Sequence, residues 1–169
     1  WQIPYIETVL GSVIGKTDSI NFTVSQQNER HINKDRTIYF CELDLPDGAV
    51  MLRKGTKVAS PEFVFLQLAG KLDIHRLIFL GLQLCSHPPG KPYEAITSRQ
   101  KIKSFVEKFK GHRGRRKAMR AIEYIQDGSA SIMESVVYMV LALPHALGGY
   151  GLGSPVFNYE IRLRDESGK

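Results

Sequence analysis

One segment of the chain gathers the residue types that contact phosphates. From Arg99 to Arg120 there are ten lysines or arginines and one acid, Glu107, although the formal net charge of the whole chain is only +6. The remainder is therefore slightly acidic, and the basic character belongs to this segment. Six of the cations gather around two glycines, at the predicted junction of two helices: Lys110, Arg113, Arg115, Arg116, Lys117 and Arg120.

These six cations have two interpretations. Runs of this kind often form a solvated helix face that only keeps a protein soluble. The alternative is contact with a nucleic-acid backbone, because cations at the N-terminus of a helix oppose its dipole and gain from a bound anion. No aromatic side chains alternate with the cations, so stacking on bases is not indicated.

Glu134 is the one acid that we select as a catalytic candidate. Its spacing from Ser131 is that of a capping box, in which the glutamate would reach back to the Ser131 amide at the start of a helix. This structural role explains the residue when it is considered alone. A catalytic role enters only through the family resemblance described below.

The cysteines and the hydrophobic runs indicate a reducing environment without a membrane. Cys41 and Cys85 lie far apart without a CxxC pair, and the five histidines are scattered, so we expect buried reduced thiols and no metal site. The first residues show no signal peptide, and no apolar run approaches the roughly 18 residues that span a bilayer. We therefore predict a cytoplasmic protein.

The predicted elements are strands up to residue 59 and helices from residue 60. Residues 19–25 alternate as a strand, and a hairpin is expected between 37–43 and 49–53, around Pro46-Asp47-Gly48. The predicted fold class is α+β, with an N-terminal antiparallel hairpin region and a central helical cluster.

Helix starts can be assigned from capping residues. The first two helices are expected after Ser60 and Asp73, and the third after Thr97, with Gln100 completing a capping box. Two more are predicted at about 115–126 and 132–143. Residues 157–164 alternate strictly between apolar and polar side chains, which predicts a final strand.

The final helix and strand also carry a family resemblance. The stretch SIMESVVYMVLALPHALGGYGLGSPVFNYEIRLRDESGK resembles the start of endonuclease-like domains related to very-short-patch-repair endonucleases, in the PD-(D/E)xK superfamily. Upstream, VASPEFVFLQLAGKLDIHRLIFLGLQLCS resembles the region before such domains in actinobacterial proteins, and is distantly similar to AbiEi-type antitoxins. The resemblance covers roughly residues 37–164.

The resemblance implies a divided chain and a metal-dependent reaction. Residues 1–128 would form an N-terminal α+β domain, β-rich over 1–59 and helical over 60–128, and 129–169 the beginning of an endonuclease-like core. In such cores the helix glutamate, here Glu134, assists in binding Mg²⁺. The essential aspartate and second acid are expected beyond Lys169, and Asp165 and Glu166 are not assigned to these roles.

The expected function follows from these points. In its full-length form the protein would be a metal-dependent phosphodiesterase acting on nucleic acid, and this chain would itself be inactive and at most bind nucleic acid, with no cofactor of its own. The alternatives are a non-catalytic antitoxin-like regulator, which would pair with a toxin, and a protein-interaction module.

Overall fold

The computed structural model describes residues 20–24, 36–40, 45–153 and 155–159. Five α-helices and four short strands lie within these ranges, so the fold is mixed α+β with a helical cluster, as the sequence predicts. The strands are β1 (Ile20–Val24), β2 (Arg36–Phe40), β3 (Val50–Arg53) and β4 (Thr56–Ala59). The helices are α2 (Pro61–Ala69), α3 (Ile74–Leu84), α4 (Arg99–Lys108), α5 (Arg115–Ile122) and α6 (Ile132–Ala142), with 3₁₀ turns η2 (Pro92–Glu94) and η3 (His145–Leu147).

The strands pair differently from the hairpin that the sequence predicts. β1 pairs with β2 in parallel, and β3 pairs with β4 in an antiparallel hairpin. The expected turn does form, since the Ala49 amide donates to the Pro46 carbonyl at 3.0 Å. The reversal between strands instead falls at Lys54-Gly55, whose φ angles are +48° and +79°. Two successive positive φ angles are typical of the tight turn that matches strand twist.

Side-chain caps define most helix starts. Ser60 accepts from the Phe63 amide at 3.2 Å, and Asp73 accepts from the Arg76 amide at 2.9 Å, as predicted. The third helix begins one residue later than expected, because Ser98 and not Thr97 is its N-cap. The Thr97 hydroxyl donates instead to the Glu62 carboxylate, which ties the start of α4 to the start of α2.

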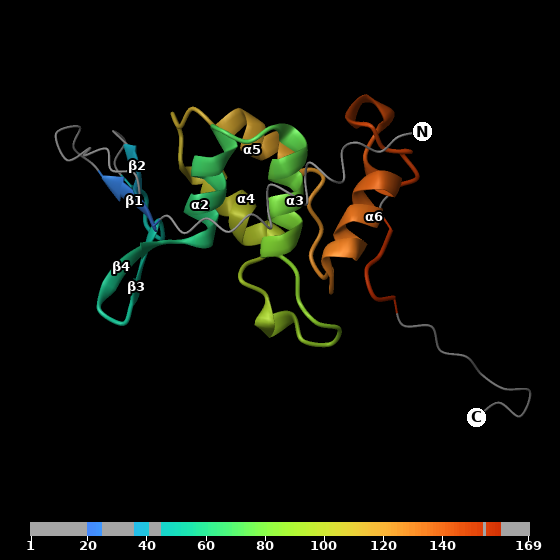
Figure 1. The fold of residues 1–169 in the computed structure, drawn as a ribbon, viewed down its shortest axis with the longest axis horizontal. Coiled ribbons are helices and arrows are strands. Elements are labelled where there is room, and N and C mark those ends of the chain that lie inside the picture. The colour runs from blue at the N-terminus through green and yellow to red at the C-terminus, as the bar shows by residue number, and fades with distance from the viewer. Residues whose placement is uncertain (1–19, 25–35, 41–44, 154, 160–169) are drawn as a thin grey trace, which may run out of the picture.

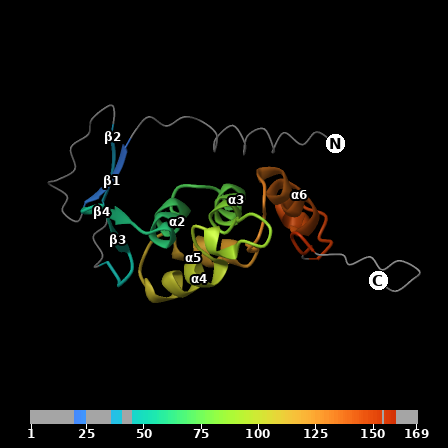
Figure 2. The ribbon, with the colours of Figure 1, turned by 90° about the horizontal axis from the view of Figure 1, so that it is seen from below.

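The hydrophobic core lies among helices α2 to α5. Figures 1 and 2 show these four helices in the middle of the molecule, with the strands at one end and α6 at the other. Phe63, Phe65 and Leu66 of α2 are completely buried, and so are Ile102 and Val106 of α4. Burying each such side chain stabilises the fold by about 1.5–3 kcal/mol. The predicted fourth helix ends early, at Ile122, yet Ile125 beyond it is still buried.

Helix α6 packs on α3 and shares the same core. Val136, Tyr138 and Met139 belong to the continuous cluster of buried apolar residues. A polar contact joins the same two helices, since the side-chain amide Nε2 of Gln83 donates to the Ser135 hydroxyl at 2.8 Å. The division of the chain at residue 128 stays a prediction.

The described beginning of the predicted final strand is not extended. Asn158 has a φ of +50° and lies in a turn, and the Phe157 ring packs on Tyr138 with centroids 5.1 Å apart. The expected alternation from residue 157 is thus broken at its second position by a left-handed residue. Residues 160–164 of this predicted strand lie outside the described residues.

Candidate nucleic-acid interface

The basic segment surrounds the turn between α4 and α5. Gly114 lies against the end of α2, so closely that a Cβ at this position would be 2.7 Å from the Gly70 nitrogen and 2.9 Å from the Leu66 oxygen. Only glycine fits there without moving backbone atoms. Because Gly114 has no side chain, the start of α5 can lie directly against the end of α2.

His112 stabilises the same turn. Its Nδ1 accepts a hydrogen bond from the Gly114 amide at 3.1 Å, and its ring packs on Phe109 with centroids 5.5 Å apart. Burial lowers the pKa of His112, which favours the neutral imidazole that this hydrogen bond needs. The sequence did not predict this hydrogen bond of His112, and its only signal is the position of His112 two residues before Gly114.

Two of the six predicted phosphate contacts have structural partners. Arg115 Nε donates to the Val106 carbonyl at 3.1 Å, and Lys117 Nζ donates to the Leu72 carbonyl at 2.7 Å. Cations are favourable beside the unpaired carbonyls at helix ends, and Val106 lies in the last turn of α4. The assignment of Arg115 and Lys117 as phosphate contacts stays a prediction. In the structure both side chains donate hydrogen bonds to backbone carbonyls.

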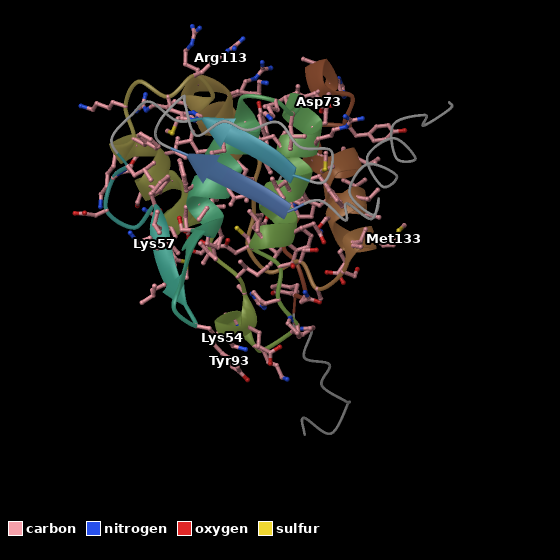
Figure 3. All side chains as sticks on the ribbon, turned by 60° about the vertical axis from the view of Figure 1, so that its left-hand side comes forward. Lys54, Lys57, Asp73, Tyr93, Arg113 and Met133 are labelled. Atoms are coloured by element: carbon pink, nitrogen blue, oxygen red, sulfur yellow. The ribbon has the colours of Figure 1, made fainter. Side chains whose placement is uncertain are left out.

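The other four predicted contacts are exposed cations. None of their side chains makes a hydrogen bond or an ion pair with another described residue, and we call them the basic patch: Lys110, Arg113, Arg116 and Arg120. Arg116 and Arg120 are four residues apart and therefore share a face of α5, and Lys110 and Arg113 belong to the turn before it. Figure 3 shows Arg113 pointing away from the body of the molecule.

Few acids compensate the basic patch. Glu107 lies 3.9 Å from Lys103, one turn earlier on α4. Glu123 is exposed at the C-cap of α5, where no described ion pair joins it to Arg120. Because like charges close together repel, exposed cations without ion-pair partners on α5 and in the turn before it favour an anionic ligand.

Glu134 has the geometry of a helix cap. The Ser131 hydroxyl accepts from the Glu134 amide at 3.1 Å, as in a capping box. The return bond differs from the prediction, since the Glu134 carboxylate accepts from the Ala130 amide at 3.0 Å and not from that of Ser131. The side-chain nitrogen Nδ2 of Asn158 also lies 3.5 Å from Oε2 of the Glu134 carboxylate. A metal-binding role for Glu134 stays a prediction, and the described residues contain no group of three metal-ligating side chains.

A shallow pocket between the 85–98 loop and the start of α4 brings together other polar side chains. Cys85, His87, Lys101 and Asp127 line it. Burial and, secondarily, the Asp127 carboxylate raise the pKa of the Cys85 thiol well above its usual range. Asp127 accepts from the Arg99 amide at 2.7 Å. Because a protonated thiol is a poor nucleophile, the pocket holds no activated cysteine.

Comparisons with protein-family models, with curated proteins and with solved structures found no significant match to this chain. The basic patch and Glu134 are therefore interpreted from their own geometry. Among the described residues, no helix combines the length and apolar character needed to cross a membrane.

Proposed function

We propose that this chain binds nucleic acid through backbone phosphates at the basic patch. The observation that supports the proposal is the exposure of four cations, on α5 and in the turn before it, that have no hydrogen-bond or ion-pair partner among the described residues. Lysine and arginine side chains that neutralise phosphates release condensed counterions, and this release drives sequence-independent binding. A reducing, cytoplasmic compartment fits the proposal, because Cys85 is a free, buried thiol.

The expected binding mode is positioning without base recognition. The basic patch offers charged groups, and the neighbouring His112 ring packs on Phe109. Contacts to phosphate carry no sequence information by themselves. We therefore expect similar affinity for duplexes of unrelated sequence, with dissociation constants of about 10⁻⁴–10⁻⁶ M at physiological salt.

Binding of a labelled mixed-sequence DNA duplex, measured by fluorescence anisotropy, tests the proposal. The variant Arg113→Gln/Arg116→Gln removes two charges of the basic patch and leaves Arg115 and Lys117 in their structural contacts. We expect its affinity to fall about tenfold, since two exposed charge contacts are together worth about 1.4 kcal/mol.

A matched control removes the same charge elsewhere. Lys91 and Lys101 are exposed and lie outside the basic patch, so Lys91→Gln/Lys101→Gln should bind nearly as tightly as the unaltered chain. An equal decrease in affinity in the two double variants would mean that only net charge matters, and the basic patch would then not be a site.

A protein-interaction role is a second candidate, favoured by the outer face of α6. Met133 and Val137 are 59% and 50% exposed, one helical turn apart. A photo-crosslinking residue in place of Val137 should give a discrete protein adduct in cells, whereas one in place of Lys91 should not. An antitoxin-like regulator would bind its partner protein through such an exposed apolar face of a helix.

An endonuclease function rests on the family resemblance alone. Phosphodiester hydrolysis requires carboxylates that converge on Mg²⁺ and activate water. Of the residues of this chain, Glu134 would be one such carboxylate, and it would have to give up its bond to the Ala130 amide. The basic patch would serve such an enzyme by holding its substrate.

A further inference from the structure

The β3–β4 hairpin presents a second set of cations, away from the basic patch. Residues 48–61 contain three, Arg53, Lys54 and Lys57, and no acid. Lys54 and Lys57 are exposed, and the side chain of neither makes a hydrogen bond or an ion pair with another described residue. The nearest acids in sequence are Asp47, in the turn before β3, and Glu62, which is bonded to Thr97. The hairpin is therefore a strongly basic projection.

Exposed apolar side chains accompany these cations. Leu52 is 73% exposed, and it is paired directly across the hairpin with Lys57. Residues that are directly opposite on paired strands share a face, so an apolar side chain and a cation stand side by side there. No described residue covers most of the Leu52 side chain.

The hairpin is anchored at its base and free at its tip. Ala49 is 1% exposed and belongs to the hydrophobic core, and its carbonyl accepts from the Ser60 amide at 2.8 Å, just before α2. Figure 1 shows the hairpin extending from the end of the helical cluster, and Figure 3 places Lys54 at its tip. The hairpin is therefore fixed to the core at its base while its tip is accessible to a ligand, and we call it the arm.

We infer that the β3–β4 hairpin is a nucleic-acid-binding arm that enters a groove of a duplex. The major groove of B-form DNA admits a two-stranded ribbon, and its walls are lined with phosphates that Lys54 and Lys57 would reach. Leu52 would make apolar contact with base edges there, such as the methyl group of thymine. This inference deepens the proposed function and rests on it for the identity of the ligand.

Salt-dependent duplex binding by three variants tests the arm. For Lys54→Gln/Lys57→Gln we expect the slope of log affinity against log salt to decrease by between about 1 and 2, roughly one unit for each phosphate that is no longer neutralised. Leu52→Ser should weaken binding about threefold at unchanged slope, because it removes no charge. Its control is Met133→Ser, because Met133 is also an exposed apolar residue but lies on α6 at the opposite end of the molecule. This variant should leave affinity unchanged.

The outcomes separate the arm from the basic patch. If Arg113→Gln/Arg116→Gln weakens binding and the hairpin variants bind as the unaltered chain does, the arm is overturned while the proposed site stands. If only the hairpin variants bind more weakly, the arm stands and the basic patch is not the site. If Leu52→Ser changes the oligomeric state in sedimentation without changing duplex binding, the hairpin joins copies of the chain and the inference is wrong.

Discussion

At the scale of single residues, the structure separates exposed cations from cations that hold the fold together. The sequence placed Arg113, Arg115, Arg116 and Lys117 in one group, because their charge and spacing are alike. Arg115 and Lys117 differ from the other two because they donate hydrogen bonds to backbone carbonyls. The carbonyl that Lys117 contacts, that of Leu72, is 45 residues away in the sequence. Long-range bonds of this kind leave no local pattern, whereas the caps Ser60 and Asp73 were predictable because their partners lie within three residues.

Replacing Arg115 should destabilise the fold more than replacing its neighbour. Arg115→Ala removes the bond to the Val106 carbonyl, at a cost of about 1 kcal/mol in the free energy of unfolding. Arg116→Ala removes only an exposed side chain and should change that free energy by less than about 0.5 kcal/mol. Urea denaturation followed by circular dichroism measures both. Equal effects would contradict a structural role for Arg115.

Two substitutions of Glu134 distinguish a cap from a metal ligand. Glu134→Gln keeps an oxygen that accepts from the Ala130 amide, so it should cost only a few tenths of a kcal/mol in the free energy of unfolding, whereas Glu134→Ala should cost about 1 kcal/mol. In a full-length nuclease both substitutions would abolish Mg²⁺-dependent cleavage, since an amide is a poor ligand for that ion. Unchanged cleavage by Glu134→Gln would leave capping as the only role.

His112 should make stability depend on pH. Its pKa in the folded state lies below the ordinary value of 6.5, so the unfolded chain takes up the proton at higher pH than the folded chain. The stability that neutral His112 contributes is therefore complete above pH 6.5 and decreases as the pH falls below it. His112→Asn offers an acceptor for the Gly114 amide that does not titrate.

The free energies of unfolding of these two proteins, measured from pH 7.5 to 5.5, should diverge. The unaltered chain should become less stable relative to His112→Asn as the pH falls. A difference between the two that is the same at every pH would show that the His112 ring does not titrate differently on folding.

At the scale of elements, helices were more predictable than strand pairing. Caps and apolar periodicity are local, so all five described helices were expected, and the two whose ranges were predicted in full end within four residues of the observed ends. The hairpin was assigned to the wrong strands, because Pro46-Asp47-Gly48 is as good a turn as Lys54-Gly55 when the sequence is considered alone. Which strand pairs with which is decided by contacts that span the chain.

The junction of α2 and α5 gives a further prediction at this scale. Gly114→Ala would put a Cβ within 2.7 Å of backbone atoms and should destabilise the fold by about 1–3 kcal/mol through overpacking. Gly70→Ala is the control, because its Cβ would meet only an ordinary contact of 3.4 Å at a helical φ of −70°. Thermal melting of both variants compares them. A tolerated Gly114→Ala would mean that the turn is not held against α2.

At the scale of the whole molecule, α6 is joined to the helical cluster by a shared core. The sequence suggested a boundary at residue 128, since a family resemblance begins just beyond it. The packing of α6 against α3 and the bond between the side chains of Gln83 and Ser135 could not be expected from that pattern. They depend on how two helices some 50 residues apart meet.

This shared core predicts that α3 and α6 unfold together. In hydrogen exchange at equilibrium, the most protected amides of the two helices should open with similar free energies, because α6 packs on α3 within one hydrophobic cluster. The exposed 88–94 loop supplies a fast-exchanging reference within the same sample. An α6 that exchanges far faster than α3 would instead support separate domains.

Binding of nucleic acid by the basic patch is the central claim, and the salt dependence of binding tests it most directly. Affinity for a mixed-sequence duplex would be measured across a range of salt concentrations for the unaltered chain and for Arg113→Gln/Arg116→Gln. We expect log affinity to fall linearly with log salt, and the slope to be smaller by about 2 in the variant, one unit for each arginine that no longer neutralises a phosphate. An identical slope in the two proteins would contradict the claim.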